Sequence, residues 1–204
     1  MLRTLTLTSK DNKKIQEERI REYFIQATKK IIKGEGLKTV NVRNIADEAG
    51  YSYATLYNYF KDIKELVFEC VKDFQFECEE TVNLETKNSR HGLSKIKNIT
   101  ISFMKYFVQY PGIFELFYLE KTSDLGHKHP TIKMIYSFLD QLTEEEWKYC
   151  IENKICNQTE AEQKKETLRN LTVGILLFYM NRHTPSSYKE FVAITDRQLN
   201  AALY

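Results

Sequence analysis

Residues that end helices are scarce in this sequence. It contains only 7 glycines and 3 prolines among 204 residues, and long stretches are free of both. Glycine and proline are the strongest local breakers of regular structure, so their scarcity favours an all-α fold with few turns. The composition, 42% hydrophobic and 28% charged, is that of an ordinary globular protein, and this length fits one or two domains.

The sequence also lacks a long apolar run. A membrane-spanning helix needs roughly 18 or more largely apolar residues in succession, and no such run is present. The first residues, MLRTLTLTSKDNKK, contain no sustained apolar segment of the kind that a signal peptide requires. We therefore expect a protein that has no membrane partner and stays in the cytoplasm.

Motifs for catalysis and metal binding are missing as well. No glycine-rich phosphate loop, G-x-S-x-G elbow or H-E-x-x-H pair is present. We therefore expect no enzymatic activity, no catalytic residue and no cofactor. The four cysteines lack zinc-type C-x-x-C spacing, which favours reduced thiols over a redox or metal role; they are Cys70, Cys78, Cys150 and Cys156. His127 and His129 alternate with Lys128 and could join a cysteine in a metal site, but a solvated loop is the favoured interpretation and no metal ligand is assigned.

What the sequence does contain is a pair of short helical patterns between Gly36 and Leu66. Asn41 is placed to cap a helix over residues 42–49, whose apolar residues recur at i, i+3, i+4 and i+7. Gly50 follows, where a helix end favours a residue that tolerates positive φ. Ser52 is placed to cap a second helix over residues 53–59. Two short helices joined by a tight glycine turn predict a helix-turn-helix motif.

The second of these helices has an unusual outer face. If Leu56 and Phe60 point inward, the outer face and flanks consist of Tyr53, Ala54, Thr55, Tyr57, Asn58 and Tyr59, with no acidic residue. A recognition helix presents such a face to DNA, because acids would repel the phosphates. The alternative is a surface helix of a plain bundle. Three exposed tyrosines favour DNA, since aromatic side chains at a surface usually contact something.

The run IADEAGYSYATLYNYFKDIKEL resembles the DNA-binding signature of the TetR (tetracycline repressor) family of bacterial regulators. The matching residues are Gly36, Thr39, Val42, Ile45, Ala46, Ala49, Gly50, Ser52, Leu56, Tyr57, Tyr59, Phe60, Lys64 and Leu66. The family usually has Thr or Ser where Asn41 stands and often His where Asn58 stands, so the base preference of relatives does not transfer. The resemblance covers about the first third of the chain.

The predicted DNA contacts divide into two groups. We expect Tyr53, Ala54, Thr55 and Asn58 to lie near bases, and Asn41, Tyr57, Tyr59 and Lys64 to lie at phosphates, with Ser52 in the same surface. The phosphate contact of Lys64 is implied by the resemblance. Residues 1–10 look like a loose arm in which Arg3 and Lys10 are available to phosphates.

Charge is distributed unevenly along the chain. Residues 1–64 hold 13 Lys and Arg against 8 Asp and Glu, whereas residues 65–204 hold 17 against 20. A basic head on a slightly acidic body suits a head that binds phosphate. Random scatter would also allow this difference, so it supports the assignment without deciding it.

Helical periodicity predicts about nine helices in two domains, a helix-turn-helix DNA-binding head over residues 1–64 and a helical body over residues 65–204. The TetR resemblance implies that this body binds a ligand and forms a dimer. In the head, a helix over residues 12–33 packs on the two motif helices, and a helix over residues 64–83 leads into the body. In the body, Thr143 with Glu146 and Thr159 with Glu162 match the capping-box pattern, which predicts a kink or a restart of the helix at Thr143 and a helix start at Thr159. A last helix begins at Pro185 or Ser187. Gly174, in mid-helix, suggests a close approach of another helix.

Aromatic residues are concentrated in the body. Candidate ligand contacts are Phe103, Tyr106, Phe107, Tyr110, Phe117, Tyr136, Trp147 and Tyr179. Aromatic side chains line many cavities for flat or lipophilic molecules, but about half of these residues are expected to be core alone. The TetR resemblance implies an inducer among these helices and a dimer built from the last two.

The sequence therefore predicts a homodimeric repressor that binds a palindromic operator in double-stranded DNA and is released by a small lipophilic or aromatic effector. An activator or DNA-organising protein of the same fold, without an inducer, is the alternative. An enzyme using Cys or His chemistry is a third hypothesis, which the missing motifs disfavour. The operator, the regulated genes and the effector are not encoded in any recognisable pattern.

Overall fold

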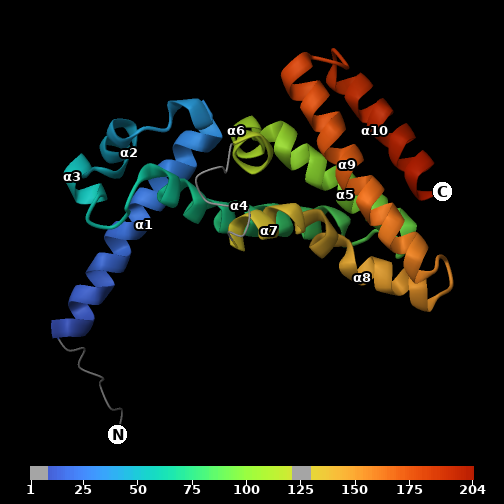
Figure 1. The fold of residues 1–204 in the computed structure, drawn as a ribbon, viewed down its shortest axis with the longest axis horizontal. Helices are drawn as coiled ribbons and strands as arrows, with labels where there is room; N and C mark the ends of the chain where they lie inside the picture. Colours follow the sequence, from blue (N-terminus) through green and yellow to red (C-terminus); the bar gives the residue numbers. More distant parts are fainter. Residues whose placement is uncertain (1–8, 121–129) are drawn as a thin grey trace, which may run out of the picture. The chain divides into compact units, whose positions relative to one another are not determined.

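The computed structural model describes residues 9–120 and 130–204. All regular elements in these ranges are helical, as predicted (Figure 1). The chain divides into two compact units, one ending at Lys72 and the other beginning at Asp73. This division lies inside helix α4 (Ile63–Thr86), whereas the division expected from the sequence lies near the start of that helix.

The first unit contains three helices and the beginning of a fourth. Their bounds are α1 (Ser9–Glu35), the 3-10 turn η1 (Leu37–Thr39), α2 (Val42–Ala49), α3 (Tyr53–Leu56) and the first part of α4. Helix α1 packs against α2 and η1, and α2 packs against α3. The side chains of Phe24, Ile32, Ile45, Leu56 and Phe60 are fully buried and form the core of this unit.

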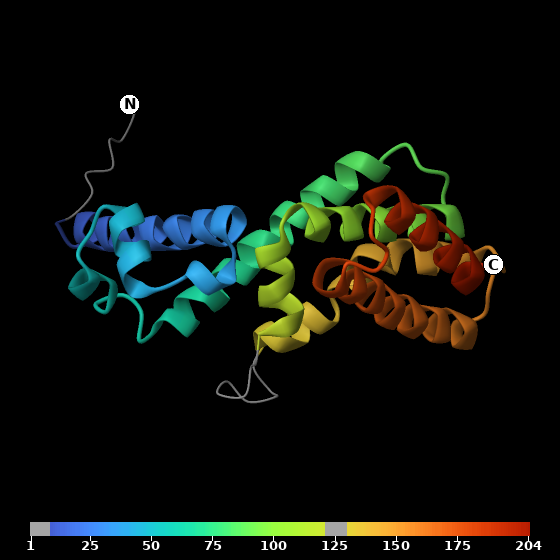
Figure 2. The ribbon, with the colours of Figure 1, turned by 90° about the horizontal axis from the view of Figure 1, so that it is seen from above.

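The second unit is built around helix α5 (Leu93–Gln109) (Figure 2). After α5 come α6 (Pro111–Phe114), the π-helical turn η2 (Glu115–Leu119), α7 (Pro130–Tyr136), α8 (Phe138–Glu152), α9 (Gln158–Arg182) and α10 (Tyr188–Leu203). Helix α5 packs against α8, α9 and α10, and α9 packs against α10. Helix α5 ends at Gln109, and Pro111 occupies the first turn of α6, where its missing N–H is tolerated.

Two predicted helix starts are wrong. The break between α7 and α8 falls at Ser137, and Thr143 lies within α8, where its hydroxyl donates to the carbonyl oxygen of Leu139 at 2.9 Å. Glu146 does not cap its own helix, because its carboxylate contacts the start of α5 instead. Helix α9 starts two residues before the predicted position, at a capping box formed by Asn157 and Glu160. In both cases a threonine-glutamate spacing matched the pattern, but α9 is capped by Asn157 and Glu160 instead, and the start of α8 has no side-chain cap.

The other boundaries agree with the sequence to within a few residues. Ser187 caps α10, as one of the two predicted starts required. Helix α3 is shorter than predicted, because after Leu56 the chain continues as a turn rather than as a helix. Among the described residues, no atom outside the helix itself lies within 4 Å of a Cβ built on Gly174, so the predicted close helix approach is absent from this part of the chain.

The described part of the chain contains ten α-helices, against about nine predicted. None of the described helices is both long and apolar enough to cross a membrane. All four cysteines are buried, and none of them forms a disulfide. Arg3, His127 and His129 lie outside the described residues, and so does the side chain of Lys10.

Candidate DNA-recognition surface and effector cavity

The turn between α2 and α3 is defined by two side-chain caps and one glycine. Asn41 Oδ1 accepts from the backbone N–H of Asn44 at 3.0 Å, and Ser52 Oγ accepts from the N–H of Thr55 at 3.1 Å. Gly50 adopts φ 74° and ψ 26°, the left-handed conformation that ends a helix at low cost only for glycine. The helix-turn-helix predicted from the sequence is therefore present, with both predicted caps in use.

Helix α3 presents an uncharged face to solvent. Tyr53 and Tyr57 are 66% and 52% exposed, and Ala54 and Asn58 are exposed between and beside them. No acidic residue lies on α3. Three of the four residues predicted to lie near bases, Tyr53, Ala54 and Asn58, are thus accessible on one short segment.

Two other predicted residues of this segment, Thr55 in α3 and Tyr59 after it, are less accessible to solvent. Thr55 is half-buried, and its hydroxyl lies 2.9 Å from Ser52 Oγ. Tyr59 is also half-buried, with its ring 6.3 Å from that of Phe24 in the core. Both side chains therefore combine a structural contact with partial access to solvent.

Helix α4 begins beside this surface in the same unit. Asp62 Oδ1 accepts from the N–H of Glu65 at 2.8 Å, and Glu65 Oε2 accepts from the N–H of Lys61 at 2.7 Å. This reciprocal arrangement fixes the first turn of α4, in which the exposed Lys64 lies. A cation in this place can approach a phosphate next to the helix N-terminus.

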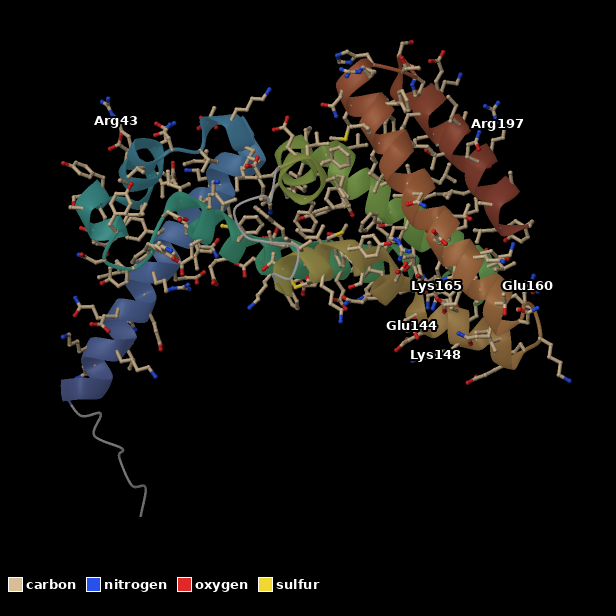
Figure 3. All side chains as sticks on the ribbon, in the orientation of Figure 1. Arg43, Glu144, Lys148, Glu160, Lys165 and Arg197 are labelled. Atoms are coloured by element: carbon tan, nitrogen blue, oxygen red, sulfur yellow. The ribbon has the colours of Figure 1, made fainter. Side chains whose placement is uncertain are left out.

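Arg43 is an additional exposed cation on the motif that the sequence reasoning did not select. Its side chain is 90% exposed and extends from the first turn of α2, as Figure 3 shows. Among the described residues, Arg43 forms a long ion pair with Asp47, with Nε 3.9 Å from Oδ2. Its position two residues after the Asn41 cap, in the first turn of α2, would have been the signal for including it.

The second unit contains a cavity of about 420 Å³. Helices α5, α8 and α9, together with η2 and the end of α7, contribute its wall, which consists of Phe103, Tyr118, Tyr136, Leu139, Arg169, Asn170, Thr172, Val173 and Gly174. This volume is within the range typical of small-molecule sites. The wall is mostly apolar, with a few polar groups from α9.

Two of the eight predicted ligand contacts, Phe103 and Tyr136, line this cavity. Phe107 and Phe117 pack with their neighbours in the aromatic core, their ring centroids 5.5 Å apart. The Tyr106 hydroxyl donates to the carbonyl oxygen of Phe74 at 3.3 Å, and burial raises the pKa of Tyr106.

The other three predicted contacts also lie outside the cavity wall. Trp147 is buried, and its indole N–H donates to Thr143 Oγ1 at 3.2 Å. Tyr179 stacks on Phe191 of α10 with ring centroids 4.4 Å apart. Tyr110 is half-buried at the end of α5, and its hydroxyl accepts from the side-chain amide of Gln109 at 3.1 Å.

The polar side of the cavity was not predicted. The guanidinium of Arg169 donates from Nη1 to a carboxylate oxygen of Asp140 on α8 and lies over the ring of Tyr136, 4.4 Å from its centroid. Arg169 Nε and Thr172 Oγ1 are buried and have no hydrogen-bond partner in the described protein. The spacing of Arg169 and Thr172 places them one turn apart on α9, but only the fold shows that this face meets a cavity.

Comparison with known proteins gives one match in sequence and many in structure. Residues 24–70 match the model of the bacterial regulatory proteins of the tetR family. No curated protein matches the chain. Similar solved structures include the transcriptional regulator FadR from Bacillus subtilis in complex with stearoyl-CoA (TM-score 0.68, 15% identity, covering 89% of this chain and 97% of that one).

Two further structures have the same fold. The fatty acid degradation regulator FadR from Bacillus halodurans has a TM-score of 0.66 at 14% identity, covering 92% of this chain and 94% of that one. A TetR family transcription regulator from Marinobacter aquaeolei VT8 has a TM-score of 0.58 at 14% identity, covering 92% and 97%. At these identities the likeness shows a shared fold along nearly the whole chain.

Proposed function

We propose that this protein is a homodimeric, sequence-specific transcriptional repressor that a small lipophilic molecule releases from DNA. Residues 24–70 match the model of the tetR family, and nearly the whole chain shares its fold with a TetR family regulator of known structure. The observation that carries the DNA-binding part is the doubly capped helix-turn-helix. Tyr53 in α3 and Tyr57 directly after it are exposed, and α3 contains no acidic residue. Since its proposed target is chromosomal DNA, the protein would act in the cytoplasm.

In the proposed complex, α3 enters the major groove. Tyr53, Ala54, Thr55 and Asn58 read base edges, while Asn41, Ser52, Tyr57, Tyr59 and Lys64 contact or approach the phosphates. The exposure of Tyr53, Ala54 and Asn58 supports the first group. We add Arg43 to the second group, because its exposed guanidinium lies on the same motif and guanidinium groups bind phosphate well.

The proposed dimer forms through α9 and α10. These helices carry large apolar side chains that are exposed in the single chain, namely Leu177, Phe178, Tyr188, Val192 and Tyr204. A dimer would place two recognition helices on two half-sites of a palindromic operator, about one helical turn apart.

The cavity of about 420 Å³ supports an effector and favours a ligand-responsive repressor over a regulator with a filled body. A neighbour in fold, FadR from Bacillus subtilis, is described in complex with stearoyl-CoA, a lipophilic ligand. Release requires that the effector bind more tightly to the conformation that does not fit the operator, because a ligand shifts an equilibrium only by its differential affinity.

Fluorescence anisotropy with labelled duplexes tests the DNA-binding part. The protein is titrated onto DNA from upstream of its own gene and onto random duplex, at several salt concentrations. We expect tighter binding to one upstream sequence and a linear fall of log affinity with log salt concentration, since cationic side chains displace counterions. Equal affinity for all duplexes would refute the proposal.

Two variants test the division between base and phosphate contacts. Lys64→Ala is expected to weaken binding to every sequence and to reduce the salt slope by about one, whereas Thr55→Val is expected to change the sequence preference. Lys105→Ala, which removes an exposed lysine from α5 in the body, is the matched control and should leave both quantities unchanged. If both head variants lose the same affinity on specific and random DNA, the division is wrong.

A further inference from the structure

The polar groups of the cavity wall indicate what kind of molecule it accepts. A guanidinium has five N–H donors in a fixed fork. In Arg169 one nitrogen, Nη1, donates to Asp140, whereas Nε is buried without a hydrogen-bond partner in the described protein. One turn further along α9, the hydroxyl of Thr172, a residue that is 1% exposed, is likewise buried and unpartnered.

Unpaired buried polar groups are costly, and each one in a folded protein requires an explanation. Arg169 and Thr172 both belong to the cavity wall, so a molecule bound in the cavity would lie beside both residues. A ligand oxygen that accepts from Arg169 Nε–H and Thr172 Oγ–H would satisfy both. The ligand therefore needs a hydrogen-bond acceptor at one end.

The charges around Arg169 argue against a carboxylate as that acceptor. Asp140 already neutralises the guanidinium. The adjacent ions are paired too: Lys165 contacts Glu144 at 3.2 Å and Glu162 at 3.0 Å, and Lys148 contacts Glu144 at 3.6 Å. Figure 3 shows Glu144, Lys148 and Lys165 together on α8 and α9. Three cations and three carboxylates thus balance in this group, so an added anion would meet no excess positive charge from it.

The state of Asp140 points in the same direction. Burial raises the pKa of Asp140 above its ordinary value, and the nearby Arg169 and Lys165 only partly oppose this. The surroundings therefore already disfavour negative charge at this place. A second carboxylate would either stand beside that of Asp140 or have to displace it from Arg169.

The rest of the wall is suited to hydrocarbon. Phe103, Leu139 and Val173 contribute apolar surface, and the exposed ring of Tyr136 covers the guanidinium. We propose that the cavity binds a neutral lipophile that carries a carbonyl group, such as an ester or an amide, with its oxygen on Arg169 Nε–H and Thr172 Oγ–H and its chain against Phe103 and Leu139. This inference rests on the proposed function only where it assigns the ligand a role in releasing DNA, because calorimetry tests ligand binding without DNA.

Isothermal titration calorimetry with the full chain tests the proposal, using methyl octanoate, octanamide and octanoate. These probes share one hydrocarbon chain and differ in the charge of the head. At neutral pH we expect the ester and the amide to bind at least tenfold more tightly than the carboxylate, and Asp140→Asn to narrow this difference, because it removes the opposing charge. Equal or tighter binding of octanoate, or no binding of either neutral probe, would overturn the proposal.

Variants identify the two donors. Thr172→Val keeps the shape of the side chain and removes the hydroxyl, and it is expected to weaken binding of the ester about three- to tenfold, the usual effect of one hydrogen bond. Thr172→Ser should restore most of this affinity. Arg169→Lys, which loses the planar fork, should weaken binding by roughly tenfold or more.

Thr167→Val is the matched control, since this exposed threonine lies on α9 outside the cavity wall. Thermal melts without ligand show whether each variant is folded, and only folded variants are compared. If Thr172→Val and Thr167→Val bind the ester equally well, Thr172 has no role in the site and the assignment of the acceptor is wrong.

Anisotropy on operator DNA separates this inference from the proposed function. Binding of the ester without release of DNA would refute the effector mechanism and leave the ligand class standing. Absence of specific DNA binding would refute the regulator and leave the calorimetry to decide the ligand class. Release of DNA by the ester, but not by octanoate at the same concentration, supports both.

Discussion

Glu146 joins helix α8 to the beginning of α5, and its replacement offers a sharp test of the structure. Its Oε2 accepts from the backbone N–H of Gly92 at 2.8 Å, and its Oε1 accepts from Lys95 Nζ at 2.9 Å. His91 Nδ1 lies 2.9 Å from the same Oε1. The side chain of Glu146 is only 5% exposed, so lost contacts cannot be fully replaced by water.

We predict that Glu146→Gln lowers the free energy of unfolding by about 2 kcal/mol. The amide has nearly the same shape but keeps only one acceptor oxygen, so either Gly92 N–H or the Lys95 ammonium loses its partner. A hydrogen bond that involves a charged group contributes about 1.5–3 kcal/mol. The lower part of this range applies, because the Lys95 side chain is 21% exposed and can be partly hydrated. For a chain of this size the melting temperature should fall by about 4–8 °C.

The effect should depend on pH in a defined direction. Burial alone raises the pKa of Glu146, but the hydrogen bonds from Gly92, Lys95 and His91 outweigh it and hold the pKa below the ordinary value of 4.5. A carboxyl group whose pKa is lowered by folding contributes stability that is fully present above the unfolded pKa. This contribution is lost as pH falls through the folded pKa. The difference between wild type and Glu146→Gln should therefore shrink in acid below pH 4.5.

Thermal denaturation followed by circular dichroism, at pH 7 and through the acid range, measures these quantities. Glu145→Gln is the matched control, since it makes the same chemical change at the exposed neighbouring position and should leave the melting temperature unchanged. A Glu146→Gln melt within 1 °C of wild type, or the same shift in both variants, would show that the contacts at the start of α5 do not stabilise the fold.

Three further predictions concern the turns and the thiols. Gly50→Ala should destabilise the protein by roughly 1–2 kcal/mol in urea denaturation, because the left-handed backbone at φ 74° disfavours a Cβ although nothing within 4 Å would clash with it; an unchanged midpoint would contradict this conformation. Asn157→Ala should lower the free energy of unfolding by about 1 kcal/mol, because α9 loses its capping box, whereas Asn157→Asp should keep the cap and the stability. A thiol reagent at pH 8 should react slowly with the cysteines of the native protein and quickly with all four in denaturant. The reason is that all four are buried and that burial raises the pKa of Cys150 to about 11. Rapid labelling of the native protein would show an exposed thiolate.

Local structure in the head could be predicted because each determinant lies within a few residues in the chain. The cap of α2 requires only that Asn41 precede the helix by one position, and the turn requires only glycine at position 50. Leu56 and Phe60 are predicted to be buried from their spacing alone, and both are fully buried. Short-range rules failed where two candidates competed, as at α9, where Asn157 caps the helix and Thr159 does not.

The sequence by itself determined the helical class, the helix-turn-helix and most helix boundaries, because periodicity, caps and breakers act over one or two turns. The tertiary structure decided the rest. Aromatic composition could not separate Phe103, which lines the cavity, from Trp147, which is packed in the core, because that distinction depends on which faces of α5, α8 and α9 meet. The pairing of Arg169 with Asp140, 29 positions apart, and the unpaired Thr172 hydroxyl likewise exist only once α8 and α9 pack together, since burial and partnership are properties of the folded chain and not of its residues.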